Sequence, residues 1–381
     1  MHNHAKSGVH QTPLARRHID TPRPAMNRRQ FTARASLAAA ALAAPLVHLQ
    51  PAEPPRRLRI GQIGTQHPHA AGKLAAVLKY PETFEFIGIV EADADRREAV
   101  KNEPPYRGLR WLQEEELLAT EGLRAVAVET AIAELVPTAI RCLHAGHHVH
   151  VDKPAGDSLD ECRAMHRLAT ERGLTVQMGY MFRYNPAFQL AHRVVREGWL
   201  GDITEVSGMI GKYADDASRR EFATYPGGGM FELACHLIDQ LVYLLGAPAK
   251  VTAHTRRSFP AKDTFADNQL AVFDYPQAIA TIRCNHIDPF GTERRQFSLT
   301  GTQGTLEIRP LEPPRARLGL DRPQGDLLRG YQDVGFPPLA GRYDAEFLDL
   351  ARVLRGEKSF AWDAAHDIAT HQAVLRAADM L

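Results

Sequence analysis

Apolar runs alternate with amphipathic stretches along residues 57–178. The runs have the length of buried strands and lie at 57–64, 84–91, 124–129, 148–151 and 175–180. Patterns with a helical period separate them, at about 68–80, 136–146 and 158–172. Strands that alternate with helices build a parallel, doubly wound sheet. Residues 57–178 are therefore predicted to form one α/β domain.

The pattern changes in residues 179–381. Alternation with a period of two predicts strands at 203–210, 249–255, 268–275, 278–284 and 296–308, the last as a hairpin. Few helices interrupt them, so they should form one mostly antiparallel sheet with a face free for packing. Amphipathic helices at about 343–355 and 363–379 close the chain. The prediction is an open-faced α+β domain behind the α/β domain.

Composition agrees with two globular domains. The chain has 381 residues, of which 44% are hydrophobic, and a domain takes roughly 100–200 residues. Residues 1–45 carry seven Lys or Arg against one Asp, so the remainder is mildly acidic. Because this remainder has no basic block, nucleic acid is not an expected partner.

Residues 1–45 are predicted to be a signal region. An Arg-Arg pair at 28–29 precedes a short apolar tract at 36–45, which is too short to span a bilayer and ends in small residues. A Pro-rich linker follows at 46–56, and Met26 is an alternative initiator. This arrangement is typical of a twin-arginine signal. We expect the twin-arginine export machinery as a partner, a periplasmic or otherwise exported location, and cofactor binding before export.

A glycine turn after the first strand predicts a nucleotide site. Gly64 ends that strand, a helix follows, and Glu91 ends the next strand. In dinucleotide-binding domains the helix N-terminus receives the pyrophosphate, and an acid at this place binds the ribose hydroxyls. The acid favours NAD over NADP, which stays the alternative because Arg96 and Arg97 lie close in the sequence.

The G-x-G-x-x-G pattern of such a turn is incomplete. Gln66 and His69 occupy its second and third glycine positions, where they crowd the phosphate and loosen the packing of the helix. Three interpretations of His67 and His69 stay open: they donate to phosphate, they bind a metal ion with Glu232 and His236, or they are polar residues without a role. The four cysteines show no metal-ligand spacing, and no metal site is predicted.

Two segments predict a proton-transfer site. Lys153 lies in the run HisHisValHisValAspLysPro at 147–154, which reads as a strand followed by a Lys-Pro turn. The glycine-rich segment 227–236 predicts a helix on which Glu232 and His236, four positions apart, share one face. A desolvated lysine and a histidine can both exchange a proton near neutral pH.

These segments belong to a series of motifs in a known order. The others are IleGlyGlnIleGlyThr (60–65), MetPheArgTyrAsnPro (181–186), GluGlyTrpLeuGlyAspIle (197–203) and GlyThrGlnGlyThrLeuGluIle (301–308). With them, residues 57–380 resemble the glucose-fructose oxidoreductase, inositol dehydrogenase and rhizopine-catabolism family of NAD(P)-dependent oxidoreductases. The resemblance implies a Rossmann domain, a sheet domain that carries the substrate face and a homo-oligomer interface, and hydride exchange between nicotinamide and a carbinol carbon of a carbohydrate.

The resemblance also implies roles for single residues. Lys153, His236 and Glu232 correspond to its catalytic residues, and Arg183, Tyr184 and Asp239 fall where members hold substrate. The positions matching its cofactor contacts are Gly61, Ile63, Gly64, Thr65, Gln66, His67, Glu91, Thr130 and Lys153.

The chain departs from the family's pattern near the cofactor. Asp152 replaces the family's Glu before the lysine, Glu232 replaces an Asp, and Thr130-Ala131-Ile132 replaces Thr-Pro-Asn. The favoured hypothesis is an oxidoreductase with tightly bound NAD(H) that acts on a sugar, cyclitol or glycoside hydroxyl. The alternatives are an NAD-dependent glycosidase that works by transient oxidation and elimination, and a carbohydrate-binding protein without catalysis.

Overall fold

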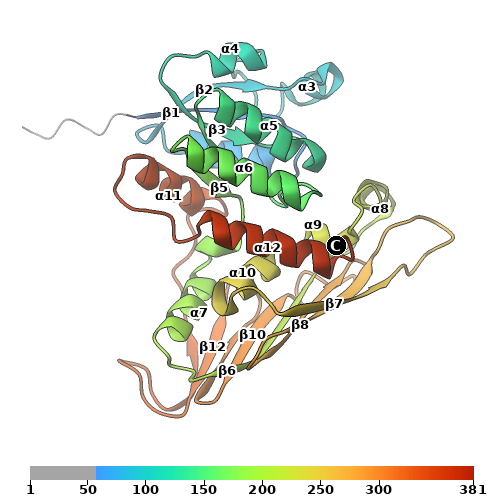
Figure 1. Ribbon diagram of the computed structural model, residues 1–381, viewed down its shortest axis with the longest axis vertical. Coiled ribbons are helices and arrows are strands. Elements are labelled where there is room, and N and C mark those ends of the chain that lie inside the picture. Colours follow the sequence, from blue (N-terminus) through green and yellow to red (C-terminus); the bar gives the residue numbers. More distant parts are fainter. Residues whose placement is uncertain (1–56) are drawn as a thin grey trace, which may run out of the picture. The chain divides into compact units, whose positions relative to one another are not determined.

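The structure is a computed structural model that describes residues 57–381 (Figure 1). The predicted signal region and the Pro-rich linker lie outside these residues. Within the described range, each helix lacks the length or the apolar character that crossing a lipid bilayer requires.

Five parallel strands form the first sheet, in the order β2-β1-β3-β4-β5. They are β1 (Leu58–Ile63), β2 (Phe84–Val90), β3 (Leu123–Val128), β4 (His148–Val151) and β5 (Val176–Met178). The helices among them are α2 (Ala70–Leu78), α3 (Ala94–Val100), α4 (Glu114–Leu118), α5 (Ile132–His144) and α6 (Leu159–Glu171). The predicted α/β domain is confirmed, although α5 begins ahead of its predicted start at 136.

Eight strands form the second sheet, in the order β13-β12-β11-β10-β6-β9-β8-β7. They are β6 (Ile203–Gly211), β7 (Lys250–Arg256), β8 (Asn268–Asp274), β9 (Ile279–Asn285), β10 (Gln296–Gly301), β11 (Gly304–Ile308), β12 (Ala316–Leu320) and β13 (Gly330–Val334). Neighbouring strands are antiparallel except for β6 and β9. The mostly antiparallel sheet is confirmed, and β12 and β13 extend it beyond the predicted strands.

Helices cover one face of this second sheet (Figure 1). The segments that follow β5 are η2 (Met181–Tyr184), α7 (Pro186–Arg196), α8 (Asp216–Phe222), α9 (Gly228–Glu232) and α10 (Cys235–Leu245), and the chain closes with α11 (Asp344–Leu354) and α12 (Ala364–Ala377). Alternation along β9 shows the two faces, because Ala280 and Ile282 are buried whereas Ile279 and Arg283 are exposed.

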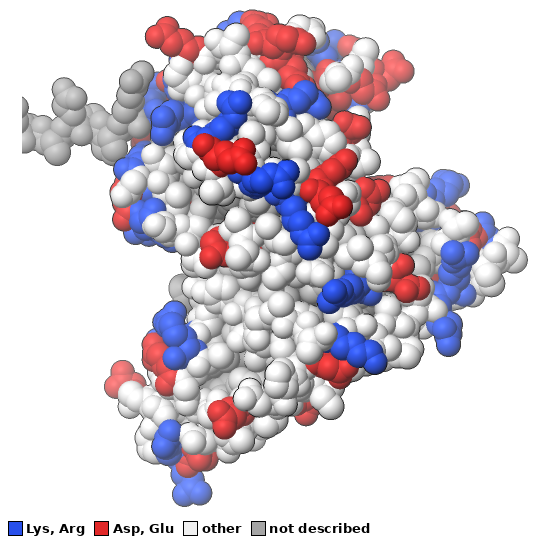
Figure 2. All heavy atoms as spheres, viewed as in Figure 1, with Lys and Arg blue, Asp and Glu red and all other residues white. Residues whose placement is uncertain are grey.

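The last two helices connect the two sheets' layers. Helix α11 packs on α2 of the first domain, and α12 packs on both α6 and α10. The carboxyl end of β4 meets the break between α9 and α10, because Lys153, which follows β4, donates a hydrogen bond to the carbonyl of Glu232. Figure 2 shows charges of both signs interspersed over the first domain on the face drawn.

Candidate active site

Lys153 and Glu232 meet where the two domains join. Lys153 follows β4, and its Nζ donates a 2.7 Å hydrogen bond to the backbone carbonyl of Glu232. The same Nζ lies 3.8 Å from Glu232 Oε1, and both side chains are buried. The structure therefore brings the predicted lysine and acid together, and it removes both from water.

The single helix predicted through Glu232 and His236 is wrong. Helix α9 ends at Glu232 and α10 begins at Cys235. In a continuous helix the carbonyl of Glu232 would accept from the N–H of His236. Here the N–H of His236 donates to the carbonyl of Leu233 instead. The carbonyl of Glu232 accepts a hydrogen bond from Lys153 Nζ. The tertiary contact thus replaces a helical hydrogen bond.

Glu232 also has two basic neighbours that were not predicted from the sequence. Lys212 Nζ lies 3.4 Å from its Oε1, and His286 Nε2 lies 3.9 Å from its Oε2. Burial alone would raise the pKa of Glu232, but Lys153, Lys212 and His286 outweigh it and lower that pKa to about 2. Among the described residues, Glu232 Oε2 and His286 Nε2 have no hydrogen-bond partner.

His236 lies in an apolar part of the same region. Its ring centroid is 5.4 Å from that of Phe182 and 6.0 Å from that of His69. Burial, followed by the charge of Lys153, lowers its pKa well below the usual value, so the ring is neutral near pH 7. Its Nδ1 is buried without a partner among the described residues, which leaves it available to a bound molecule.

The glycine turn fits a nucleotide on its adenosine side. Gly64 has φ +92°, and a Cβ there would lie 2.5 Å from the backbone nitrogen of Thr130, so only glycine suits this turn. Glu91 accepts from the backbone N–H and the hydroxyl of Thr65, at 2.9 and 2.7 Å. A cavity of about 230 Å³ lies beside this pair and is lined in part by Ile63, Gly64, Glu91 and Thr130.

The phosphate side of the turn has few free donors. The N–H of His67 donates to the carbonyl of Glu129, the N–H of His69 points at His67 Nδ1, and Pro68 has none. Gln66 lies between the adenosine-side cavity and a second one of about 670 Å³, which is also lined by Thr65, His67 and Arg96. Gly61 lies farther back in β1, where Leu117 would block a Cβ, away from both cavities.

Of the predicted substrate residues, Arg183 and Asp239 are buried and Tyr184 is partly buried. Arg183 makes a two-pronged ion pair with Asp239, at 2.7 to 3.2 Å, and also pairs with Asp367 of α12. The hydroxyl of Tyr184 donates to Asp349 of α11 at 3.0 Å. These contacts fasten η2 to the C-terminal helices. Arg183, Tyr184 and Asp239 therefore have structural contacts, and their predicted contact with substrate stays a prediction.

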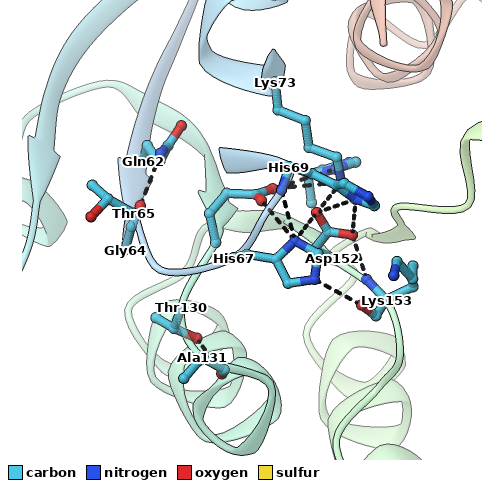
Figure 3. A network of polar contacts seen from close by, with 12 residues as sticks. Gln62, Gly64, Thr65, His67, His69, Lys73, Thr130, Ala131, Asp152 and Lys153 are labelled. Atoms are coloured by element: carbon cyan, nitrogen blue, oxygen red, sulfur yellow. Dashed lines mark hydrogen bonds and ion pairs between the residues drawn. The ribbon is translucent and has the colours of Figure 1, made fainter. Parts of the chain in front are cut away.

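A buried polar cluster lies behind Lys153 (Figure 3). Asp152 Oδ2 lies 2.9 Å from His67 Nδ1, 3.2 Å from His69 Nδ1 and 2.8 Å from Lys73 Nζ. Burial lowers the pKa of His69 to about 3, although Asp152 opposes that shift. The two histidines therefore meet Asp152, rather than Glu232 and His236 as in the predicted metal interpretation. The interaction joins two departures from the family's pattern, His69 and Asp152.

The fold and site define a two-domain oxidoreductase with an NAD-binding domain. Residues 58–180 match the family model described as "Oxidoreductase family, NAD-binding Rossmann fold", and residues 188–307 match the "GFO/IDH/MocA C-terminal domain". The two matches together cover more than half of the chain. The chain belongs to the GFO/IDH/MocA oxidoreductase family.

Relatives within this family are distant. The scyllo-inositol 2-dehydrogenase (NAD(+)) of Bacillus subtilis is 27% identical over 205 residues, which cover 52% of this chain and 59% of that protein. The scyllo-inositol 2-dehydrogenase (NADP(+)) of the same organism is 27% identical over 48% of this chain and 51% of its own length. The solved WlbA dehydrogenase of Bordetella pertussis, in complex with NADH and UDP-GlcNAcA, has a TM-score of 0.68 at 18% identity, covering 84% of this chain and 95% of that one. This last likeness shows the fold.

Proposed function

We propose that the chain is an exported NAD(P)-dependent oxidoreductase that acts on a CH–OH carbon of a sugar, cyclitol or glycoside. One observation carries the proposal: Lys153, Glu232, His236 and His286 are gathered in a buried region, and three of them have side-chain polar atoms without a partner among the described residues. Buried polar atoms are normally paired. A hydroxylated ligand would pair them.

The chemistry follows from the charges of these groups. Bound nicotinamide would accept or return the hydride of the carbinol carbon. A neutral His236 can accept the hydroxyl proton, while the ammonium of Lys153 stabilises the oxygen as its proton leaves. Glu232 fixes Lys153 through its backbone carbonyl and its carboxylate. Gly64, Thr65, Glu91 and Thr130 would hold the adenosine half of the cofactor.

The proposal is supported by the family and by the named activities of relatives. Two relatives are inositol dehydrogenases, and the solved WlbA structure holds a nucleotide sugar and NADH. The scarcity of free N–H donors at the phosphate turn favours one competitor, a carbohydrate-binding protein without cofactor. Our proposal instead takes the cofactor as bound tightly before export.

The deciding experiment is the cofactor content of the purified, folded protein. We expect mass spectrometry of the denatured supernatant to find about one NAD(H) per chain. Bound nicotinamide should change its absorbance when sugars, cyclitols or glycosides are added from a panel. In Lys153→Met this change should be lost, whereas Lys250→Met, an exposed lysine on β7, should keep it. A protein that binds carbohydrate without any nicotinamide would overturn the proposal in favour of the binding protein.

A further inference from the structure

We propose that His67, His69, Asp152 and Glu129 bind a divalent transition-metal ion between the glycine turn and the end of β4. His67, His69 and Asp152 offer ligand atoms that all lie within 4.8 Å of one another. The separations of 2.9 and 3.2 Å between Asp152 Oδ2 and the two Nδ1 atoms are close to the roughly 3.3 Å between ligands of a tetrahedral ion with bonds near 2.0 Å. Figure 3 shows the two rings turned toward this carboxylate.

The tautomer of His67 favours a cation between its Nδ1 and Asp152. Its Nε2 lies 3.0 Å from the carbonyl oxygen of Lys153, which can only accept, so Nε2 carries the ring proton. In the neutral ring, Nδ1 then carries the lone pair; it accepts from the backbone N–H of His69 at 3.2 Å and also lies 2.9 Å from the oxygen of Asp152. A metal ion bound to Nδ1 would displace this N–H. Two acceptors so close repel each other unless a proton or a metal ion lies between them.

Glu129 favours a metal ion over a proton between His67 and Asp152. Its carboxylate is fully buried, and both oxygens are without hydrogen-bond partners among the described residues. Glu129 Oε2 lies 3.9 Å from His67 Nδ1, so this carboxyl group adjoins the cluster. One added proton would satisfy only the contact between His67 and Asp152. A metal ion placed among the four side chains would also take Glu129.

The charges of the cluster also leave room for a divalent ion. Three buried carboxyl groups, those of Glu129, Asp152 and Glu346, surround one ammonium group, that of Lys73. Lys73 Nζ lies 2.8 Å from Asp152 Oδ2 and 3.6 Å from Glu129 Oε1, so it neutralises part of their charge. Burial, followed by the charge of Asp152, raises the pKa of Glu129, so without a cation nearby this carboxyl group favours its neutral form. A bound metal ion would instead take the ionised carboxylate as a ligand.

The ligand set indicates the class of metal. Two imidazoles with two carboxylates suit Zn²⁺, Fe²⁺ or Co²⁺, whereas Mg²⁺ and Ca²⁺ prefer oxygen ligands alone. The outer contact of His67 with the carbonyl of Lys153 is the kind of support that orients a metal-bound histidine. The ion would thereby fix the backbone of Lys153 relative to the glycine turn. This inference does not depend on the proposed activity.

The test uses the purified full-length protein, stripped by a chelator and titrated with Zn²⁺ by calorimetry and with Co²⁺ by visible absorbance. We expect one ion per chain, a Co²⁺ spectrum of a four-coordinate site, and a higher melting temperature with metal. His69 is the ligand to change, because it is partly exposed and His69→Gln should still fold. The Kd of His69→Gln for Zn²⁺ should rise by more than about 100-fold, the upper end of what loss of an outer contact costs.

The control is His254→Gln, an exposed histidine on β7, which should bind Zn²⁺ as the parent protein does. Two results would overturn the inference. The first is equal Zn²⁺ binding by His69→Gln and the parent protein, which would place the ion elsewhere. The second is a parent protein without stoichiometric binding whose His67 ring keeps both protons by nitrogen NMR, which would show that a proton fills the gap.

Discussion

Single side chains decide the charge of the candidate site. Lys153, Lys212 and His286 converge on one carboxylate, that of Glu232, and keep it ionised in a buried place. The sequence predicted Lys153 and Glu232, because each lies in a recognisable motif. It could not predict Lys212 and His286, since their approach depends on the pairing of β6 with β9, 70 or more positions apart in the chain.

Lys153→Met and His236→Asn should reduce turnover by about 10²- to 10⁴-fold, the usual contribution of a general acid or base. The buried position of Lys153 adds a stability cost that a solvated lysine would not have. Its loss leaves the carbonyl of Glu232 with only the weak thiol donor of Cys235, at 3.4 Å, which costs about 0.5–1.5 kcal/mol. Melting curves should therefore fall for Lys153→Met and stay nearly unchanged for His236→Asn. Near-native turnover of both variants would contradict the assignment.

Glu232→Gln should change the acid stability of the protein. The pKa of Glu232 is lowered in the folded state to about 2, so its ionised form stabilises the fold above the unfolded pKa near 4.5. That contribution, at most about 3 kcal/mol, is lost as the pH falls from about 4.5 to about 2. Urea unfolding of both proteins should show the largest difference at pH 6 and convergence near pH 2. A difference independent of pH would mean that Glu232 is not held ionised.

At the scale of elements, periodicity predicted the strands well and the helix ends less well. The strands β1 to β11 were predictable because each apolar pattern is local to its segment. The break between α9 and α10 was not predictable, since the i, i+4 spacing of Glu232 and His236 suits a continuous helix. The hydrogen bond that replaces the helical one comes from Lys153, in the other domain. Strands β12 and β13 escaped prediction because prolines and glycines interrupt their surroundings.

Glu91, directly after β2, should determine whether NAD or NADP binds more tightly. Two like charges 4 Å apart cost about 4 kcal/mol at an effective dielectric constant of 20, so Glu91 should repel the 2′-phosphate of NADP. We expect cofactor-stripped protein to bind NAD more tightly than NADP. In Glu91→Gln the ratio of the Kd for NADP to the Kd for NAD should fall by at least about tenfold, or about 1.4 kcal/mol. Glu85→Gln, within β2, is the control. Tighter binding of NADP by the parent protein would reverse the assignment.

At the scale of the whole molecule, the open face of the second sheet is the surface on which we expect a second copy to bind. Ile279, the first residue of β9, is 59% exposed on this face, and Leu270 and Val272 of β8 are half-buried on the same side. Ile279→Lys should lower the mass measured by light scattering from an oligomer toward a monomer. Leu328→Lys, an exposed position between β12 and β13, should leave it unchanged. An unaltered mass in both variants would place the interface elsewhere.

The proposed export would involve the molecule as a whole, because the twin-arginine pathway would carry the folded protein and its cofactor across the membrane together with the signal. The Arg28 and Arg29 pair before the short alanine-rich tract motivates this prediction. Arg28→Lys with Arg29→Lys should retain the protein in the cytoplasm, still folded and with its cofactor. The matched control is Arg16→Lys with Arg17→Lys, a second Arg-Arg pair upstream that no apolar tract follows directly. Fractionation followed by immunoblotting measures both, and equal periplasmic yield of the two double variants would exclude twin-arginine export.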